Sequence, residues 1–189
     1  MEETRQVFNI PLEKYDKDIN PEKKKEIHEL LTSHNKLCSQ EELDEIDNFL
    51  HSACHRGDLE AIEIYISETI NNETNDLKFK INKTNKTASL FKINNTQIEH
   101  LIVPRTVKHE SDEYLITSIC WLGGEQESPS TIKTIKFEEN SSVNRIYQLA
   151  FAFSEVEEIY FPTSLIKLDS AWCFDLRNLK KIIISPSNH

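Results

Sequence analysis

The sequence predicts an α+β chain in two parts: helical hairpins, followed by a short solenoid whose strands stack into a parallel sheet. Three observations lead to this expectation. The net charge changes near residue 77, apolar residues recur at helical spacing before that point, and one strand pattern recurs at a regular interval after residue 98. Helical spacing places apolar side chains on one helix face, whereas a repeat of about 20–29 residues is typical of stacked structural units.

Charge divides the chain of 189 residues, whose formal net charge is −10. Residues 1–77 contain 8 Lys and Arg against 19 Asp and Glu, whereas residues 78–189 contain 14 against 13. Such a break is expected where two differently built segments meet. We therefore predict a loose arm at 1–20, an acidic helical segment at 21–77 and a solenoid at 78–189. Neither part has the basic surface that nucleic acid requires, so no nucleic-acid partner is expected.

The N-terminal residues 1–4 lack the basic and apolar regions of a secretory signal, and no apolar run approaches the roughly 20 residues that cross a bilayer. We therefore expect a cytoplasmic protein without membrane insertion. Three glycines in the whole chain argue against a phosphate-binding loop, so no cofactor is expected. In a reducing compartment, the widely spaced cysteines are predicted to be buried thiols: Cys38, Cys54, Cys120 and Cys173.

Apolar residues at helical spacing predict three helices in the acidic segment. The first begins at Asn20-Pro21, because Asn caps a helix and Pro suits its first position. The second begins near Ser39, with Glu42 completing a capping box. The third covers about residues 59–69. Short turns between such helices favour antiparallel packing.

One stretch of this segment, residues 50–60, reads L-H-x-A followed by G-x-L-E and resembles an ankyrin repeat. The small Ala53 lets two helices press together, and Gly57 lies where the chain reverses. The resemblance implies ankyrin-like helical hairpins, and a plain three-helix bundle is the alternative. Residues 71–96 are rich in Asn, Lys and Thr, and within them 79–81 and 88–93 are predicted to form a short hairpin that joins the two parts.

After the hairpin, the pattern apolar-x-x-apolar-x-apolar recurs at intervals of 34, 24 and 23 residues; it starts at Ile98, Ile132, Val156 and Leu179. The longer first interval predicts an insertion near 111–114 or 123–130. A second element lies between the strands and is expected to turn an aromatic side chain inward. It is found at Ile146 to Phe151, Leu168 to Trp172 and, more loosely, Ile116 to Trp121.

This period and this strand signature indicate a leucine-rich repeat. A single turn cannot bury its apolar edge, so successive turns must stack strand on strand. The alternative, an antiparallel β domain, places turn signals roughly every 8–12 residues, which is about half the interval seen here.

Particular phrases also resemble the BspA-like leucine-rich repeats, a family expanded in parasitic protists. They are found at 101–107, 113–119, 164–168, 172–173 and 179–188, and the resemblance covers roughly residues 78–189. It implies a surface or interaction protein, adhesin-like where secreted, so the cell surface is the alternative location.

Residues that suggest chemistry have simpler explanations. His51, Cys54 and His55 lie close together, but structural zinc needs four ligands and no second Cys or His pair lies at a suitable spacing. Cys120 and Cys173 have no orienting histidine nearby, which leaves a thiol enzyme as the less favoured alternative. No Walker loop, dinucleotide fingerprint or Ser-His-Asp order is present. We therefore expect no catalytic residues, no metal and no enzyme.

Alternate side chains along a strand point to opposite faces of the sheet. If the pattern residues face the core, the residues between them form two columns on the concave face. The first column is His100, Thr134, Glu158 and Lys181, and the second is Ile102, Lys136, Tyr160 and Ile183.

The second column combines an aromatic residue with apolar neighbours that the core does not require, which is the composition of a binding hot spot. We therefore predict a non-enzymatic module that binds a protein partner there, centred on Tyr160. The alternatives are a sheet surface that tolerates apolar residues and a fragment of a surface adhesin or structural repeat protein. The open C-terminal end of the stack is a second candidate surface, for self-association.

Overall fold

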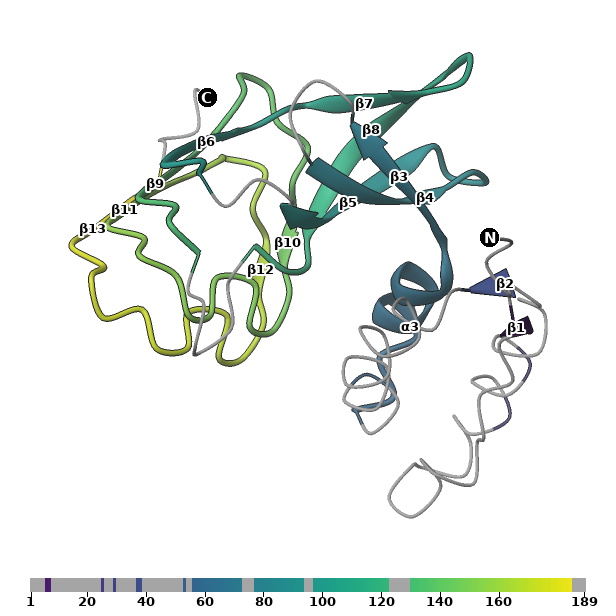
Figure 1. Ribbon diagram of the computed structural model, residues 1–189, viewed down its shortest axis with the longest axis horizontal. Helices are drawn as coiled ribbons and strands as arrows, with labels where there is room; N and C mark the ends of the chain where they lie inside the picture. The colour runs from purple at the N-terminus through teal and green to yellow at the C-terminus, as the bar shows by residue number, and fades with distance from the viewer. Residues whose placement is uncertain are drawn as a thin grey trace, which may run out of the picture. The chain divides into compact units, whose positions relative to one another are not determined.

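The computed structural model describes residues 6–7, 25, 29, 37–38, 53, 56–72, 77–93, 97–122 and 130–184. The chain divides into two compact units, Met1–Ser67 and Glu68–His189 (Figure 1). The first unit contains a helix and a small strand pair. The second is built of strands and carries the candidate site.

Helix α3 (Leu59–Ile66) has a local cause for its start and its end. The Asp58 side chain accepts a hydrogen bond from the backbone N–H of Ala61 at 3.2 Å, which satisfies one of the free donors of the first turn. The backbone becomes extended at Ser67, whose hydroxyl donates to the Ile64 carbonyl at 2.7 Å. The predicted third helix is therefore present, and it ends before Thr69.

The ankyrin-like helical hairpins are not supported. A hairpin requires two packed helices, and in the described part of the first unit α3 is the one helix with defined bounds. Most of the segment predicted for the first two helices lies outside the described residues. A short antiparallel pair, β1 (Gln6–Val7) with β2 (Leu37–Cys38), joins segments in which the sequence predicts no strand.

The second unit begins with an antiparallel meander of β3 (Glu68–Asn72), β4 (Leu77–Asn82) and β5 (Thr87–Ile93). The β4–β5 pair confirms the predicted hairpin. Asn82 closes its turn, because the side-chain oxygen accepts two backbone N–H groups at 3.0 Å each. This hairpin belongs to the second unit. We refer to β3, β4 and β5 as the cap.

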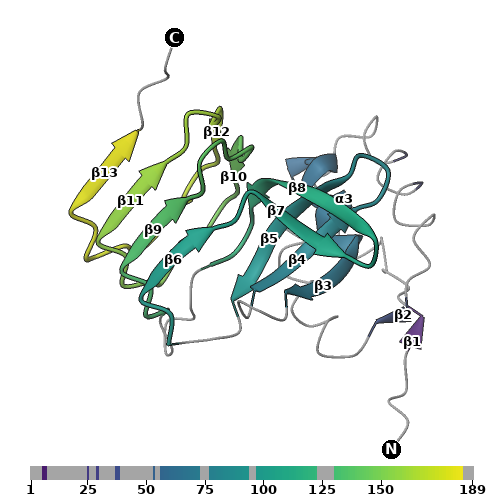
Figure 2. The same cartoon turned by 90° about the horizontal axis from the view of Figure 1, so that it is seen from above.

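Four parallel strands then form one sheet, in the order β6 (His100–Val103), β9 (Thr134–Phe137), β11 (Glu158–Phe161) and β13 (Lys181–Ile184) (Figure 2). Each strand contains the end of one copy of the predicted repeat pattern. Side chains alternate between core and surface along β6 and β11, as the period of a strand requires. The predicted stack of parallel strands is confirmed.

A second ladder runs along the other side of the stack, with β8 (Asp112–Ile119), β10 (Arg145–Ile146) and β12 (Lys167–Leu168) in parallel. Strand β8 also pairs in parallel with β5, and antiparallel with β7 (Thr106–His109). One seven-stranded sheet therefore passes from the cap into the stack. The β7–β8 hairpin is the insertion predicted near 111–114; most of the other candidate stretch lies outside the described residues.

The register of the first connecting element differs from the prediction. Ile119, and not Ile116, pairs with Ile146 of the next turn. Ile116 instead lies beside Ala88 of the cap, because β8 is long enough to pair with β5 before it reaches the stack. After Ile119 the Leu122 side chain is buried and Trp121 is half-buried, so the inward aromatic position expected in this turn stays a prediction.

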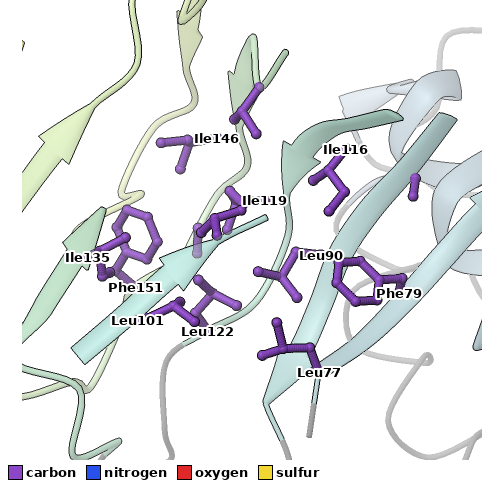
Figure 3. Close-up of a cluster of buried hydrophobic side chains, with 14 of the residues drawn as sticks. Leu77, Phe79, Leu90, Leu101, Ile116, Ile119, Leu122, Ile135, Ile146 and Phe151 are labelled. Carbon is purple, nitrogen blue, oxygen red and sulfur yellow. The ribbon is translucent and has the colours of Figure 1, made fainter. Parts of the chain in front are cut away.

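One hydrophobic core fills both the cap and the stack (Figure 3). Leu77, Phe79 and Leu90 come from the cap, and Ile135 and Phe151 come from the stack. Because these side chains share a core, the cap covers the first turn of the stack, and the solenoid does not begin with an exposed apolar edge.

Each later turn reverses its direction through two residues with left-handed backbone. Leu149 (φ 60°) and Phe153 (φ 52°) occupy these positions in one turn, and Ala171 (φ 54°) and Asp175 (φ 56°) occupy them in the next. A side chain with a Cβ disfavours this conformation by about 1–2 kcal/mol per residue. The stack therefore tolerates local backbone strain at the same places in successive turns.

Replacing Ala171 by glycine is expected to raise the free energy of unfolding by about 0.5–1 kcal/mol, because glycine adopts positive φ without steric cost. The neighbouring Ser170→Gly is the matched control and should lower it, since Ser170 is not among the residues with positive φ. Urea denaturation of both variants measures the difference. Destabilisation by Ala171→Gly as large as that by Ser170→Gly would contradict the backbone geometry described here.

Candidate protein-binding face

The eight predicted site residues lie together on the surface side of the four-stranded sheet. In the first column, His100 lies beside Thr134, Thr134 beside Glu158, and Glu158 beside Lys181. The second column pairs Ile102 with Lys136, and Tyr160 with Ile183. All eight are exposed or half-buried, while the neighbouring Leu101, Ile135 and Ile159 are buried. We call these eight residues the outer face.

Tyr160 is held in place from several directions. Its hydroxyl donates a hydrogen bond to the Glu158 carboxylate at 2.5 Å. The Lys136 and Lys181 ammonium groups lie 4.8 Å and 5.6 Å from the centre of its ring. Cation–π contacts at exposed positions contribute about 0.5–1 kcal/mol each. The ring is therefore ordered without being buried.

The hydrogen bond to Glu158 raises the pKa of the Tyr160 phenol above its ordinary value, and partial desolvation acts in the same direction. The phenol keeps its proton and remains a donor at neutral pH. Around it the outer face presents apolar surface from Ile102 and Ile183, and positive charge from two lysines. This combination suits a partner surface that carries an apolar side chain next to a carboxylate.

A row of alternating charges runs along one margin of the outer face, one residue before each strand. Its members are Glu99, Lys133, Glu157 and Lys180, which we call the charge ladder. Lys133 lies 3.0 Å from Glu99, and Lys180 lies 2.8 Å from Glu157. The backbone N–H of each later member also donates to the carbonyl of the member before it, at 2.7–2.8 Å.

These ion pairs shift the ionisation of their members. The hydrogen bond from Lys180 lowers the pKa of Glu157, and the hydrogen bond to Glu99 raises the pKa of Lys133. Both groups stay charged at neutral pH, so the ladder links successive turns electrostatically. The ladder is not among the features predicted from the sequence. The signal that indicates it is the alternating sign of the charge at one position of the repeat.

Groups that suggest chemistry take no part in the outer face. Cys120 is buried and Cys173 is half-buried, and neither forms a disulfide. Residues 51, 54 and 55 lie outside the described part. Across the residues that are described, no three His, Cys, Asp or Glu side chains are placed to hold a metal ion. Within the same part of the chain, no helix combines the length and the apolar character needed to cross a membrane.

No protein-family model matches the sequence, and no curated protein matches it. Three solved structures are similar. The pneumococcal vaccine antigen PcpA is 18% identical (TM-score 0.43; 64% of this chain, 39% of that one). A leucine-rich cell surface protein from Faecalibacterium prausnitzii is 14% identical (TM-score 0.35; 62% of this chain, 43% of that one). The chain therefore spans less than half the length of each of these two proteins. A leucine-rich repeat protein from Bacteroides capillosus is 20% identical (TM-score 0.39; 64% of this chain, 100% of that one).

Proposed function

We propose that this protein is a non-enzymatic binding module with a leucine-rich-repeat architecture, and that it recognises a protein partner through the outer face centred on Tyr160. The observation that carries the proposal is the placement of Tyr160 between two lysines, on a face whose side chains do not contribute to the core. The inaccessibility of the buried Cys120 thiol supports the non-enzymatic part.

The energetics of association favour such a face. Tyrosine is enriched among the few residues that dominate binding energy, because its ring buries a large area and its hydroxyl still forms hydrogen bonds. Glu158 and the two lysines already restrict the ring, so less conformational entropy is lost when a partner covers it. Lys136 and Lys181 attract a carboxylate, and Ile102 and Ile183 accept an apolar side chain.

Affinity purification from the native cell, with the full chain as bait, should enrich a partner that the double variant Tyr160→Asp/Lys136→Glu loses. With the isolated partner, Tyr160→Ala alone should weaken binding at least about thirtyfold, which corresponds to the roughly 2 kcal/mol of a hot-spot residue. Circular dichroism should be unchanged, because neither side chain belongs to the core.

Lys108→Glu is the matched control, since it makes the same charge change at an exposed lysine on β7, outside the four-stranded sheet. It should leave binding intact. If the partner remains bound to the folded double variant, the binding site lies elsewhere on the chain and the assignment of the outer face is wrong.

The compartment is a separate prediction. The sequence predicts the cytoplasm, and the resemblance to BspA-like repeats implies the cell surface as the alternative. Fractionation of the native cell, combined with protease treatment of intact cells, distinguishes the two, because only a surface protein is digested without lysis.

A further inference from the structure

Exposed apolar side chains gather at the last turn of the stack. Seven large apolar residues of the described part are exposed, and five of them belong to this turn or to its strands: Ile166, Leu168, Phe174, Ile182 and Ile184. Strands β12 and β13 are the last strands of their sheets, so each of them has one edge without a strand neighbour among the described residues. Apolar side chains and strand edges without a described neighbour therefore coincide at one end of the stack.

Three of these side chains occupy core positions. Ile182 is 47% exposed and Ile184 71%, although their neighbours one turn earlier, Ile159 and Phe161, are 0% and 2% exposed. Leu168 is likewise exposed, whereas its neighbour Ile146 is fully buried. The residues at this end have the chemistry of the interior, and one more layer placed against them would bury them.

The opposite end of the stack cannot supply that layer. There, β8 is already paired with β5 of the cap, and the cap side chains share the core with the first turn. A second copy stacked head to tail could not extend the seven-stranded sheet, because the edge of β8 is already paired with β5. Two copies that meet through their last turns can extend both sheets, through β12 and through β13.

We propose that two copies of this chain associate through these ends about a two-fold axis, with β13 antiparallel to β13 of the second copy. Pairing centred on Ile183 places Ile182 opposite Ile184 of the other copy. Residues opposite each other in an antiparallel pair lie on the same face of the sheet. Both isoleucines of each copy then complete the core of the other, and the interface is isologous.

Charges at this end do not oppose the pairing. The Asp169 carboxylate is 10% exposed and is already paired within one copy, with Arg145 at 2.8 Å and with Lys167 at 3.4 Å. Lys180 and Lys181 lie at the beginning of β13, so antiparallel pairing puts the like charges of the two copies at opposite ends of the paired strands.

Sedimentation velocity of the full chain over a concentration series is expected to show a monomer–dimer equilibrium without larger species. Ile184→Glu should raise the dimer Kd by at least about a hundredfold, because each dimer then buries two unpaired carboxylates. Ile184 is exposed in the monomer, so the variant should fold normally. Leu115→Glu is the matched control, at a leucine 39% exposed on β8, and should leave the Kd unchanged.

A cysteine placed at the centre of the pairing tests the geometry. Oxidation of Ile183→Cys should give a covalent dimer in which peptide mapping finds residue 183 linked to residue 183, because paired residues of antiparallel strands approach within disulfide reach. Thr134→Cys on the interior strand β9 should give no such link.

A monomer at all concentrations would overturn the proposal, and so would a dimer that Ile184→Glu leaves intact. Open-ended polymers, or a link from residue 183 to any other position, would show that the copies do not meet tail to tail. None of these outcomes depends on whether the outer face binds another protein.

Discussion

Phe151→Ala is expected to lower the free energy of unfolding by about 3–5 kcal/mol, which is the usual cost of removing a buried phenylalanine side chain. Phe151 is fully buried, and its ring meets the Trp172 ring edge to face at a centroid distance of 5.9 Å. The indole also contacts Phe161 at 5.6 Å. The substitution therefore leaves a cavity between two turns and removes the aromatic contact that joins them.

Phe174→Ala provides the comparison. Phe174 makes a similar edge contact with Phe153 at 5.7 Å, but it is 54% exposed. Its removal should cost less than about 1 kcal/mol, because the space is open to water and little apolar area is lost. Chemical denaturation followed by circular dichroism measures both variants. Equal losses would contradict the placement of Phe151 in the interior.

Asp169→Ala should destabilise the protein by a similar amount, about 3–5 kcal/mol, because it leaves a buried guanidinium without its carboxylate. The Arg145 and Asp169 side chains are 6% and 10% exposed, and their closest atoms, Nη2 and Oδ2, are 2.8 Å apart. Arg145 also donates to the Tyr147 hydroxyl at 3.1 Å and lies over the Tyr147 ring at 3.9 Å. The pair joins two adjacent turns on β10 and after β12.

Two comparisons separate burial from simple ion pairing. Asp175→Ala breaks the pair with Arg177, which has the same 2.8 Å separation, but that arginine is 78% exposed, so the loss should stay within about 1 kcal/mol. The double variant Arg145→Met/Asp169→Ala should recover much of the stability lost by Asp169→Ala, because the buried charge that has lost the Asp169 carboxylate is removed. If the double variant is no more stable than Asp169→Ala, the cost does not come from the buried charge.

The strands of the stack could be predicted from the sequence because each is fixed by its own residues. The alternation of buried and exposed side chains in β6 and β11 follows directly from the sequence pattern. The same alternation, applied across four turns, was enough to place Tyr160 beside Ile183 and Ile102 beside Lys136. Strand pairing and face could therefore both be inferred from local periodicity.

The cap could not be predicted in the same way. β3 reads E-T-I-N-N, which has no strand pattern of its own, and the apolar spacing before it favours a helix to Thr69. Pairing of every β3 residue with β4 makes this segment a strand, because such tertiary pairing overrides local propensity. Ile116 and Ile119 both fit the sequence pattern, and only the pairing of β8 with β10 selects Ile119.

Contacts between turns could not be predicted from the local sequence either. The Arg145–Asp169 pair joins residues 24 positions apart, and its burial depends on how the turns stack. The charge ladder differs from this pair, because its signal is contained in the sequence. Its alternation of Glu and Lys was present in the sequence, but it becomes visible only when the turns are aligned by their strands.

The alternation of the charge ladder sets a rule for how such an array can be lengthened. Duplicating a single turn inside the stack would place two residues of like charge side by side, either two lysines or two glutamates. Duplicating two consecutive turns, such as residues 133–179, would restore the order Glu, Lys, Glu, Lys throughout. Charge thus makes a pair of turns, and not one turn, the unit by which this sequence can grow without internal repulsion.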